Sequence, residues 1–130
     1  MKNGYTLIEV VIIGILALTV IALLSSHTQT ATENSAKFSE KSLRTQVSLY
    51  KIDHGNAPPT SLRLLTTKTN ADHSTTGSPA LGPYLDEIPT NPLTGRSSLT
   101  ESDSATGPSA DGGWTYDTDS GMLWADIVTR

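Results

Sequence analysis

The clearest pattern in the chain is an apolar stretch close to its N-terminus. Between residues 10 and 24 the only polar side chain is Thr19. Counting back to Tyr5 gives about 20 residues, or ~30 Å of helix, which is about the thickness of the hydrocarbon layer of a bilayer. Lys2 lies on the N-terminal flank, and cytoplasmic flanks are enriched in basic residues. The pattern therefore predicts a transmembrane helix over residues 5–24, with its N-terminus in the cytoplasm.

The pattern then changes to that of an amphipathic helix over residues 25–54. Glu40 and Arg44 form a favourable pair four residues apart, and apolar residues recur at roughly helical spacing. A glycine and two prolines between residues 55 and 59 provide a strong signal for the end of a helix. The sequence therefore predicts one helix from residue 5 to about residue 53, whose second half packs on the rest of the chain. The apolar positions of this second half are Ala36, Phe38, Leu43, Val47 and Tyr50.

The remaining residues, 55–130, predict a small globular head. The leucines near residue 62 predict a short helix with Thr60 or Ser61 as its N-cap. Residues 66–78 are mostly polar and predict a loop. Two aromatic segments flank a turn that ends in glycine, which predicts a β-hairpin over residues 113–127. The expected fold class is α+β, with the long N-terminal helix packed against a small antiparallel sheet.

Charge is distributed unevenly over the 130 residues, whose net charge is -4. Basic residues predominate between residues 27 and 68, and acidic residues predominate between residues 86 and 130. Complementary surfaces of this kind orient protein partners, although a solvated surface without a partner explains the pattern equally well. No dense Lys/Arg cluster is present, so nucleic acid is not an expected partner. The absence of cysteine excludes disulfides.

Glu9 is the unusual residue of the N-terminal segment. It places a carboxylate at the mouth of the apolar stretch, where a charge is costly and is expected to face a partner inside an assembly. A secretory signal peptide with a cleavage region near Ser25 and Ser26, or a plain membrane anchor, would explain the apolar stretch. Neither of them explains Glu9.

The run Gly4-Tyr5-Thr6-Leu7-Ile8-Glu9, followed at once by the apolar stretch, resembles the N-terminal signal of type IV pilins and of the pseudopilins of type II secretion. The resemblance extends to the proline-rich segment 82–95. It implies the pilin fold, cleavage after Gly4 by a prepilin peptidase, and N-methylation of Tyr5. It also implies that Glu9 acts in filament assembly. The carboxylate of Glu9 would meet the new amine of Tyr5 on a neighbouring subunit, and this attraction is strong in a low-dielectric bundle.

These residues predict a structural subunit of a pilin-like filament, either a type II secretion pseudopilus or a type IV pilus. The absence of cysteine, the short head and the tyrosine and proline landmarks together favour a subunit that resembles a major pseudopilin. The resemblance implies as partners further copies of the chain, related minor subunits, a prepilin peptidase, an assembly platform protein with its ATPase, and inner-membrane lipid. The expected location is the bacterial inner membrane, with a single span, the head outside the cytoplasm and the filament in the periplasm or at the cell surface. A different hypothesis is a membrane-anchored exported binding protein that uses the tryptophan-rich hairpin.

Other chemistry has little support in the sequence. Asp103, Asp111, Asp117 and Asp119 offer hard oxygen ligands, so calcium is the one cofactor to consider. Their spacing matches no EF-hand, and ordinary turn aspartates explain them as well. The three histidines are scattered along the chain and suggest no site. An enzyme is not expected, since the sequence contains no nucleophile elbow, phosphate-binding glycine loop or His-Glu-x-x-His motif.

Overall fold

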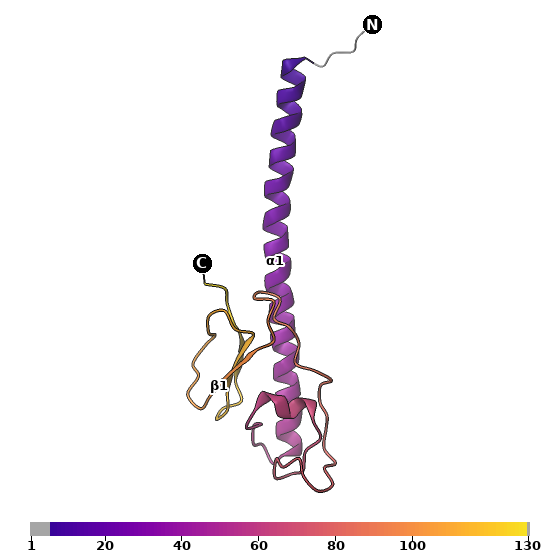
Figure 1. Cartoon of the computed structure of the whole chain (residues 1–130), viewed down its shortest axis with the longest axis vertical. Helices are drawn as coiled ribbons and strands as arrows, with labels where there is room; N and C mark the ends of the chain where they lie inside the picture. The colour runs from indigo at the N-terminus through magenta and orange to yellow at the C-terminus, as the bar shows by residue number, and fades with distance from the viewer. Residues whose placement is uncertain (1–5, 130) are drawn as a thin grey trace. The chain divides into compact units, whose positions relative to one another are not determined.

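The structure is a computed structural model that describes residues 6–129, with the side chains at positions 22, 25 and 26 excepted. The chain divides into two compact units, Met1–Thr32 and Glu33–Arg130. The described part of the first unit consists of Thr6 and the first part of a helix that runs on into the second unit. The elements in chain order are α1 (Leu7–Asp53), the 3-10 helix η1 (Leu62–Thr66), β1 (Leu99–Ser102), β2 (Trp114–Asp117) and β3 (Leu123–Ala125) (Figure 1).

Helix α1 ends at a glycine cap. Gly55 has a positive φ of 65°, a conformation that glycine adopts without steric cost. The Asn56 N–H then donates to the Lys51 carbonyl at 2.7 Å, which is the six-to-one hydrogen bond of a Schellman motif. Pro58 follows and is unable to continue a helix. The observed bounds of α1 are close to the predicted range of residues 5–53.

The core of the second unit lies between α1, η1 and the sheet. The short helix predicted near residue 62 is confirmed as the 3-10 helix η1. Ser61 is its N-cap, because the Ser61 side chain accepts from the Arg63 N–H. The half-buried Tyr84, Leu85 and Ile88 pack against the core from the proline-rich segment. The buried apolar residues that form the core are Leu43, Val47 and Tyr50 of α1, Leu62 and Leu65 of η1, Trp114 and Tyr116 of β2, and Leu123 of β3.

The sheet is mixed, and the prediction of an antiparallel sheet is wrong. Its strand order is β1-β2-β3, in which β2 pairs antiparallel with β3, as expected for the hairpin, but parallel with β1. The parallel pair arises because residues 103–113 cross back to the start of the sheet before β2 begins, and only a crossover of this kind joins parallel neighbours. The register places Trp114 opposite Leu99 on one side and Ala125 on the other.

Side chains of α1 close the outer edge of β3. The Arg44 guanidinium donates to the Leu123 carbonyl, with Nε at 2.9 Å and Nη2 at 2.6 Å. Glu40 accepts from the Ala125 N–H at 2.9 Å and forms an ion pair with Arg44, also at 2.9 Å. The predicted Glu40–Arg44 pair is therefore confirmed, and it does more than stabilise the helix. It satisfies backbone groups that an edge strand would otherwise expose to another chain.

The predicted membrane span requires a correction. Among the described residues, no helix combines the length and the apolar content needed to cross a bilayer. The prediction counted back to Tyr5, but Thr6 and Glu9 form polar hydrogen bonds at the start of α1. The apolar run itself, residues 10–24, corresponds to only about 22 Å of helix. The expectations of a transmembrane first half of the helix and of a single-pass inner-membrane location are therefore wrong.

Candidate functional site

Glu9, the residue predicted to act in filament assembly, forms part of the N-terminal cap of α1. The Thr6 N–H donates to Glu9 Oε2 at 2.9 Å, and the Glu9 N–H donates to Thr6 Oγ1 at 3.4 Å. This reciprocal pair is a capping box, in which the two side chains satisfy backbone donors that the helix itself leaves unpaired. A carboxylate in the first turn also interacts favourably with the helix dipole. Glu9 therefore has a structural role within one chain, which the sequence analysis missed although the Thr-x-x-Glu spacing signals it.

The two other predicted residues of this site, Gly4 and Tyr5, lie outside the described residues. Cleavage after Gly4 and methylation of Tyr5 therefore stay predictions. Glu9 is exposed, and its hydrogen bond within the cap uses Oε2. Because an ionised carboxylate offers about four lone-pair sites, Glu9 has room for a second partner from another chain.

The first unit presents an apolar surface on all sides of α1. Large apolar side chains between residues 7 and 24 range from 51% exposed at Val11 to 81% exposed at Leu7. They follow one another along the chain and therefore point in every direction around the helix, since successive residues are about 100° apart. A helix that is apolar on all sides is typically buried in its functional state. This surface is the strongest candidate for an interaction site among the described residues.

The aspartates considered for calcium do not come together. Among residues 6–129, no group of three or more His, Cys, Asp or Glu side chains is arranged to hold a metal. Asp111 instead accepts from the N–H and the hydroxyl of Thr129, close to the C-terminus. Asp117 accepts from the Asp119 N–H at 3.1 Å and from the Ser120 hydroxyl, which closes the turn between β2 and β3. These contacts identify Asp111 and Asp117 as residues that order local backbone.

Asp117 makes the stability of the fold depend on pH in the acidic range. Its hydrogen bond from the Ser120 hydroxyl lowers the pKa of its carboxyl below the ordinary value. A carboxylate with a lowered pKa in the folded state stabilises the fold above its unfolded pKa of about 3.9, and this contribution is lost as the pH falls through the folded pKa. We therefore expect the difference in unfolding free energy between the wild type and Asp117→Asn to shrink below about pH 4. Urea unfolding at several pH values measures this difference in unfolding free energy. Asp119→Asn, which changes another aspartate of the same turn, is the control. An unchanged difference down to pH 2 would contradict the assignment.

A cluster of aromatic and imidazole rings lies at the C-terminal end of α1. His54 stacks on Tyr50 with a centroid distance of 3.7 Å, and the His73 ring lies 5.0 Å from the His54 ring. The Tyr50 carbonyl can only accept, so His54 Nδ1, 2.8 Å away, donates to it, and His54 Nε2 lies 2.9 Å from the Thr69 hydroxyl. Burial raises the pKa of the Tyr50 hydroxyl, which lies 2.7 Å from His73 Nδ1. The sequence does not indicate that these histidines come together, because nothing in the local pattern shows that the chain folds back here.

The two tryptophans of the hairpin have different environments. Trp114 is fully buried, and its Nε1–H donates to the Pro89 carbonyl at 2.7 Å. Trp124 pairs with Thr115 on the other face of the sheet and is only half-buried. The hairpin therefore does not present two rings to a ligand, and Trp114 has no free face on which a sugar or peptide would stack.

Asp126 is a buried carboxylate that the sequence analysis grouped with the surface acids. Its Oδ1 accepts from the Ser109 N–H at 2.8 Å and from the Thr115 hydroxyl. Its Oδ2 is buried without a hydrogen-bond partner among the described residues. A Cβ at position 112 would lie 2.3 Å from Oδ2, so Gly112 provides the space that this carboxylate occupies. Asp126 thereby links the loop before β2 to the end of β3.

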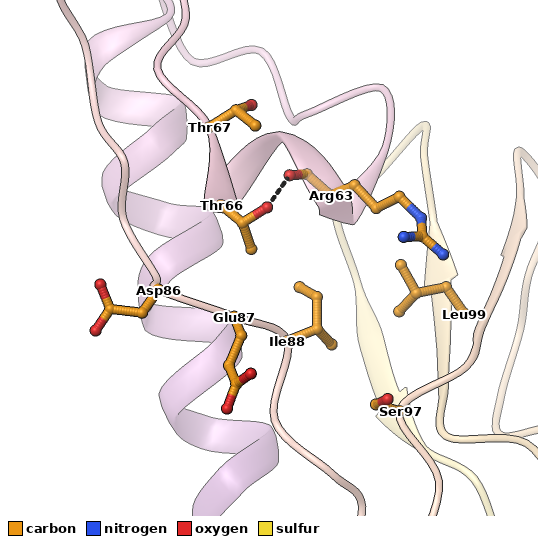
Figure 2. A pocket seen from close by; sticks show the side chains of 8 residues that line it. All are labelled: Arg63, Thr66, Thr67, Asp86, Glu87, Ile88, Ser97 and Leu99. Carbon is orange, nitrogen blue, oxygen red and sulfur yellow. Dashed lines mark hydrogen bonds between the residues drawn. The ribbon is translucent and has the colours of Figure 1, made fainter.

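The head carries a pocket of about 540 Å³, within the size range of ligand sites. We call it the head pocket. Figure 2 shows the Arg63 guanidinium beside Leu99, across the pocket from the side chains of Asp86 and Glu87. Its apolar lining comes from Ile88 and Leu99, and carboxylates outnumber guanidinium groups, so it suits an apolar group with a cation beside it. Its lining residues are Arg63, Thr66, Thr67, Asp86, Glu87, Ile88, Ser97 and Leu99.

No family model matches this chain, and neither the curated proteins nor the solved structures contain a match to it.

Proposed function

We propose that this protein is a structural subunit of a pilin-like filament, processed after Gly4 and assembled through the N-terminal part of α1. The observation that carries the proposal is the apolar surface of residues 7–24, which is exposed around the whole circumference of the helix. Burying one such side chain stabilises an assembly by roughly 1.5–3 kcal/mol. Neighbouring copies of the same helix provide a partner surface of equal length and matching apolar character.

Glu9 has two tasks in this proposal. Within one chain it caps α1 together with Thr6. Between chains its carboxylate pairs with the amine of Tyr5, which exists only after cleavage behind Gly4. A single charged residue in an apolar seam is a known means of setting register. Cleavage and assembly are thereby linked, because an uncleaved subunit lacks the amine that Glu9 needs.

The resemblance of residues 4–9 to pilin signals supports the identity of the other components. A prepilin peptidase removes residues 1–4, and an assembly ATPase with its platform protein drives addition of subunits. Related minor subunits and further copies of this chain form the filament. The filament serves either as a secretion pseudopilus or as a surface pilus.

A charge placed in the apolar surface tests the proposal. We expect the wild type, expressed as the full chain in bacteria that supply a pilin assembly system, to be recovered as sedimentable filaments whose subunits begin at Tyr5. Leu16→Glu is expected to abolish the sedimentable fraction, since each copy would bury an unpaired carboxylate among apolar neighbours. Ultracentrifugation, negative-stain electron microscopy and intact-mass measurement provide the readouts.

Gln29→Glu is the matched control, because it adds the same charge to α1 beyond the apolar run, at an exposed position. It is expected to assemble like the wild type. The proposal fails if the wild type stays monomeric, if its mature chain begins elsewhere than Tyr5, or if Leu16→Glu assembles normally.

A further inference from the structure

The second unit has an exposed apolar ridge on the side of α1 that faces away from the core. Phe38 is 76% exposed and Ile52 is 75% exposed, whereas Leu43 and Val47 on the opposite side are buried. Large apolar side chains with this degree of exposure on an otherwise well-packed unit mark an interaction surface when they gather on one face. The outer face of α1, as we call it, consists of Phe38, Lys41, Thr45, Leu49 and Ile52, which are spaced so that they share one side of the helix.

We propose that the outer face of α1 docks into the head pocket of a second copy of this chain, with Phe38 as the anchor. Phe38 enters the pocket between Ile88 and Leu99 of the second copy. Lys41, one turn further along the helix, pairs with Asp86 or Glu87 at the rim. This docking rests on the proposed filament function and specifies which surfaces of neighbouring heads meet.

The size and the apolar lining of the head pocket suit the Phe38 side chain. The head pocket, at about 540 Å³, is large enough for a phenylalanine ring. Ile88 and Leu99 pack against the core from one side and offer the ring an apolar wall. Arg63 is exposed beside Leu99 (Figure 2), and a guanidinium placed over an aromatic face is attracted to it. Aromatic side chains seated in pockets contribute most of the binding energy in typical interfaces.

The charges of the two surfaces are also complementary. Asp86 and Glu87 are exposed at the pocket and have no hydrogen-bond or ion-pair partner among the described residues. Lys41 is exposed on the outer face of α1, and its ammonium group has no hydrogen-bond or ion-pair partner among the described residues. A lysine ammonium brought next to two carboxylates neutralises part of their mutual repulsion. This pairing fixes the orientation of the incoming helix more than it raises affinity.

The proposed contact can repeat from one subunit to the next. The anchor and the pocket are different surfaces of the same molecule, so a copy that offers its pocket still has a free outer face of α1. Such a heterologous contact repeats from copy to copy and builds either a ring or an open helical filament. Docking between heads therefore adds a second contact to the one made by the apolar helices.

Cysteine cross-linking tests the contact. No native cysteine can form a competing disulfide, because the chain has none. We expect the full-length double variant Lys41→Cys with Glu87→Cys to form disulfide-linked trimers and larger species on mild oxidation of filaments. The double variant Lys41→Cys with Asp119→Cys is the control, since Asp119 is exposed in a turn that does not line the pocket. It is expected to stay uncross-linked.

Charge exchange provides a second, independent measurement. Lys41→Glu and Glu87→Lys are each expected to reduce filament yield, and the double variant is expected to restore it. Phe38→Ala is expected to raise the concentration needed for half-maximal assembly roughly tenfold or more, as for other aromatic anchors. Because Phe38 is exposed within one chain, this variant keeps the unfolding midpoint of the wild type.

The outcomes separate the docking from the filament proposal. If the wild type forms filaments, but the Lys41→Cys, Glu87→Cys variant gives no disulfide-linked species and charge exchange gives no rescue, the docking is overturned and the filament function stands. Failure of the wild type to form filaments would overturn both. Cross-linking of the cysteine pair and rescue by charge exchange, together with the loss of filaments in the separate Leu16→Glu variant, would support both.

Discussion

Replacing Trp114 with alanine is expected to reduce the unfolding free energy of the head by about 3–5 kcal/mol, the usual cost of removing a buried aromatic side chain. Trp114 is fully buried among α1, η1 and β3 residues of the core. The substitution also removes the hydrogen bond from its Nε1–H to the Pro89 carbonyl, which leaves that carbonyl without its partner. Small domains have about 5–15 kcal/mol of stability in total, so this one change removes a large share. Urea unfolding followed by circular dichroism measures the loss.

Trp124→Ala is the matched control, because it removes the same side chain from the half-buried face of the hairpin. We expect it to cost about 1 kcal/mol, in the range of partly exposed positions. Equal losses in the two variants would contradict the core assignment. If Trp114→Ala does not fold at all, Trp114→Phe retains most of the ring and removes the hydrogen bond, and its expected cost is about 1–2 kcal/mol.

Glu9→Gln is expected to abolish filament assembly while leaving α1 capped. Glutamine at the third helical position serves in a capping box as glutamate does, so the backbone donor that Glu9 now satisfies keeps its partner. The negative charge, however, is lost, and with it the attraction to the Tyr5 amine of the neighbouring subunit. Glu9→Ala removes both the cap and the charge and is expected to abolish assembly and also to fray the first turn of α1. Filament yield by sedimentation and amide hydrogen exchange of residues 7–11 measure the two effects separately.

Glu33→Gln is the control for charge alone, since it removes an exposed carboxylate elsewhere on α1. We expect it to assemble like the wild type. If Glu9→Gln assembles normally and Glu9→Ala does not, the residue acts only as a helix cap, and the charge-pairing part of the proposed function is wrong. Normal assembly of both variants would remove Glu9 from the site altogether.

The candidate site was only partly predictable from the sequence. The apolar surface and Glu9 are visible as a pattern of neighbouring residues, and the Thr6-x-x-Glu9 spacing indicates the cap as well. The head pocket is different, since Arg63, Glu87 and Leu99 come from three separate segments and share no local pattern. The same holds for the stacked rings of His54 and His73.

The aspartates show that a sequence pattern can also suggest a site that the structure does not form. Their clustering in the C-terminal third suggested calcium, yet Asp111 and Asp117 bind hydroxyl and backbone donors close to them. Asp126, which had no individual role in the sequence analysis, is the one that the fold buries completely. A carboxylate at a turn and a carboxylate in a core look alike in sequence, because only the packing around them decides whether they meet water, a hydroxyl or an ion.

The sequence by itself determined the elements whose contacts are local. Helix α1 follows from hydrogen bonds between residues four apart, with Thr6 and Glu9 at its start and Gly55 at its end, and the hairpin of β2 and β3 follows from two aromatic segments around one turn. Tertiary structure alone decided the parallel pairing of β1, the closure of β3 by Glu40 and Arg44, and the head pocket. These features join residues that are far apart in the chain, and their formation depends on which surfaces the core brings together. No pattern of neighbouring residues encodes that choice, since it is made by the packing of the whole unit.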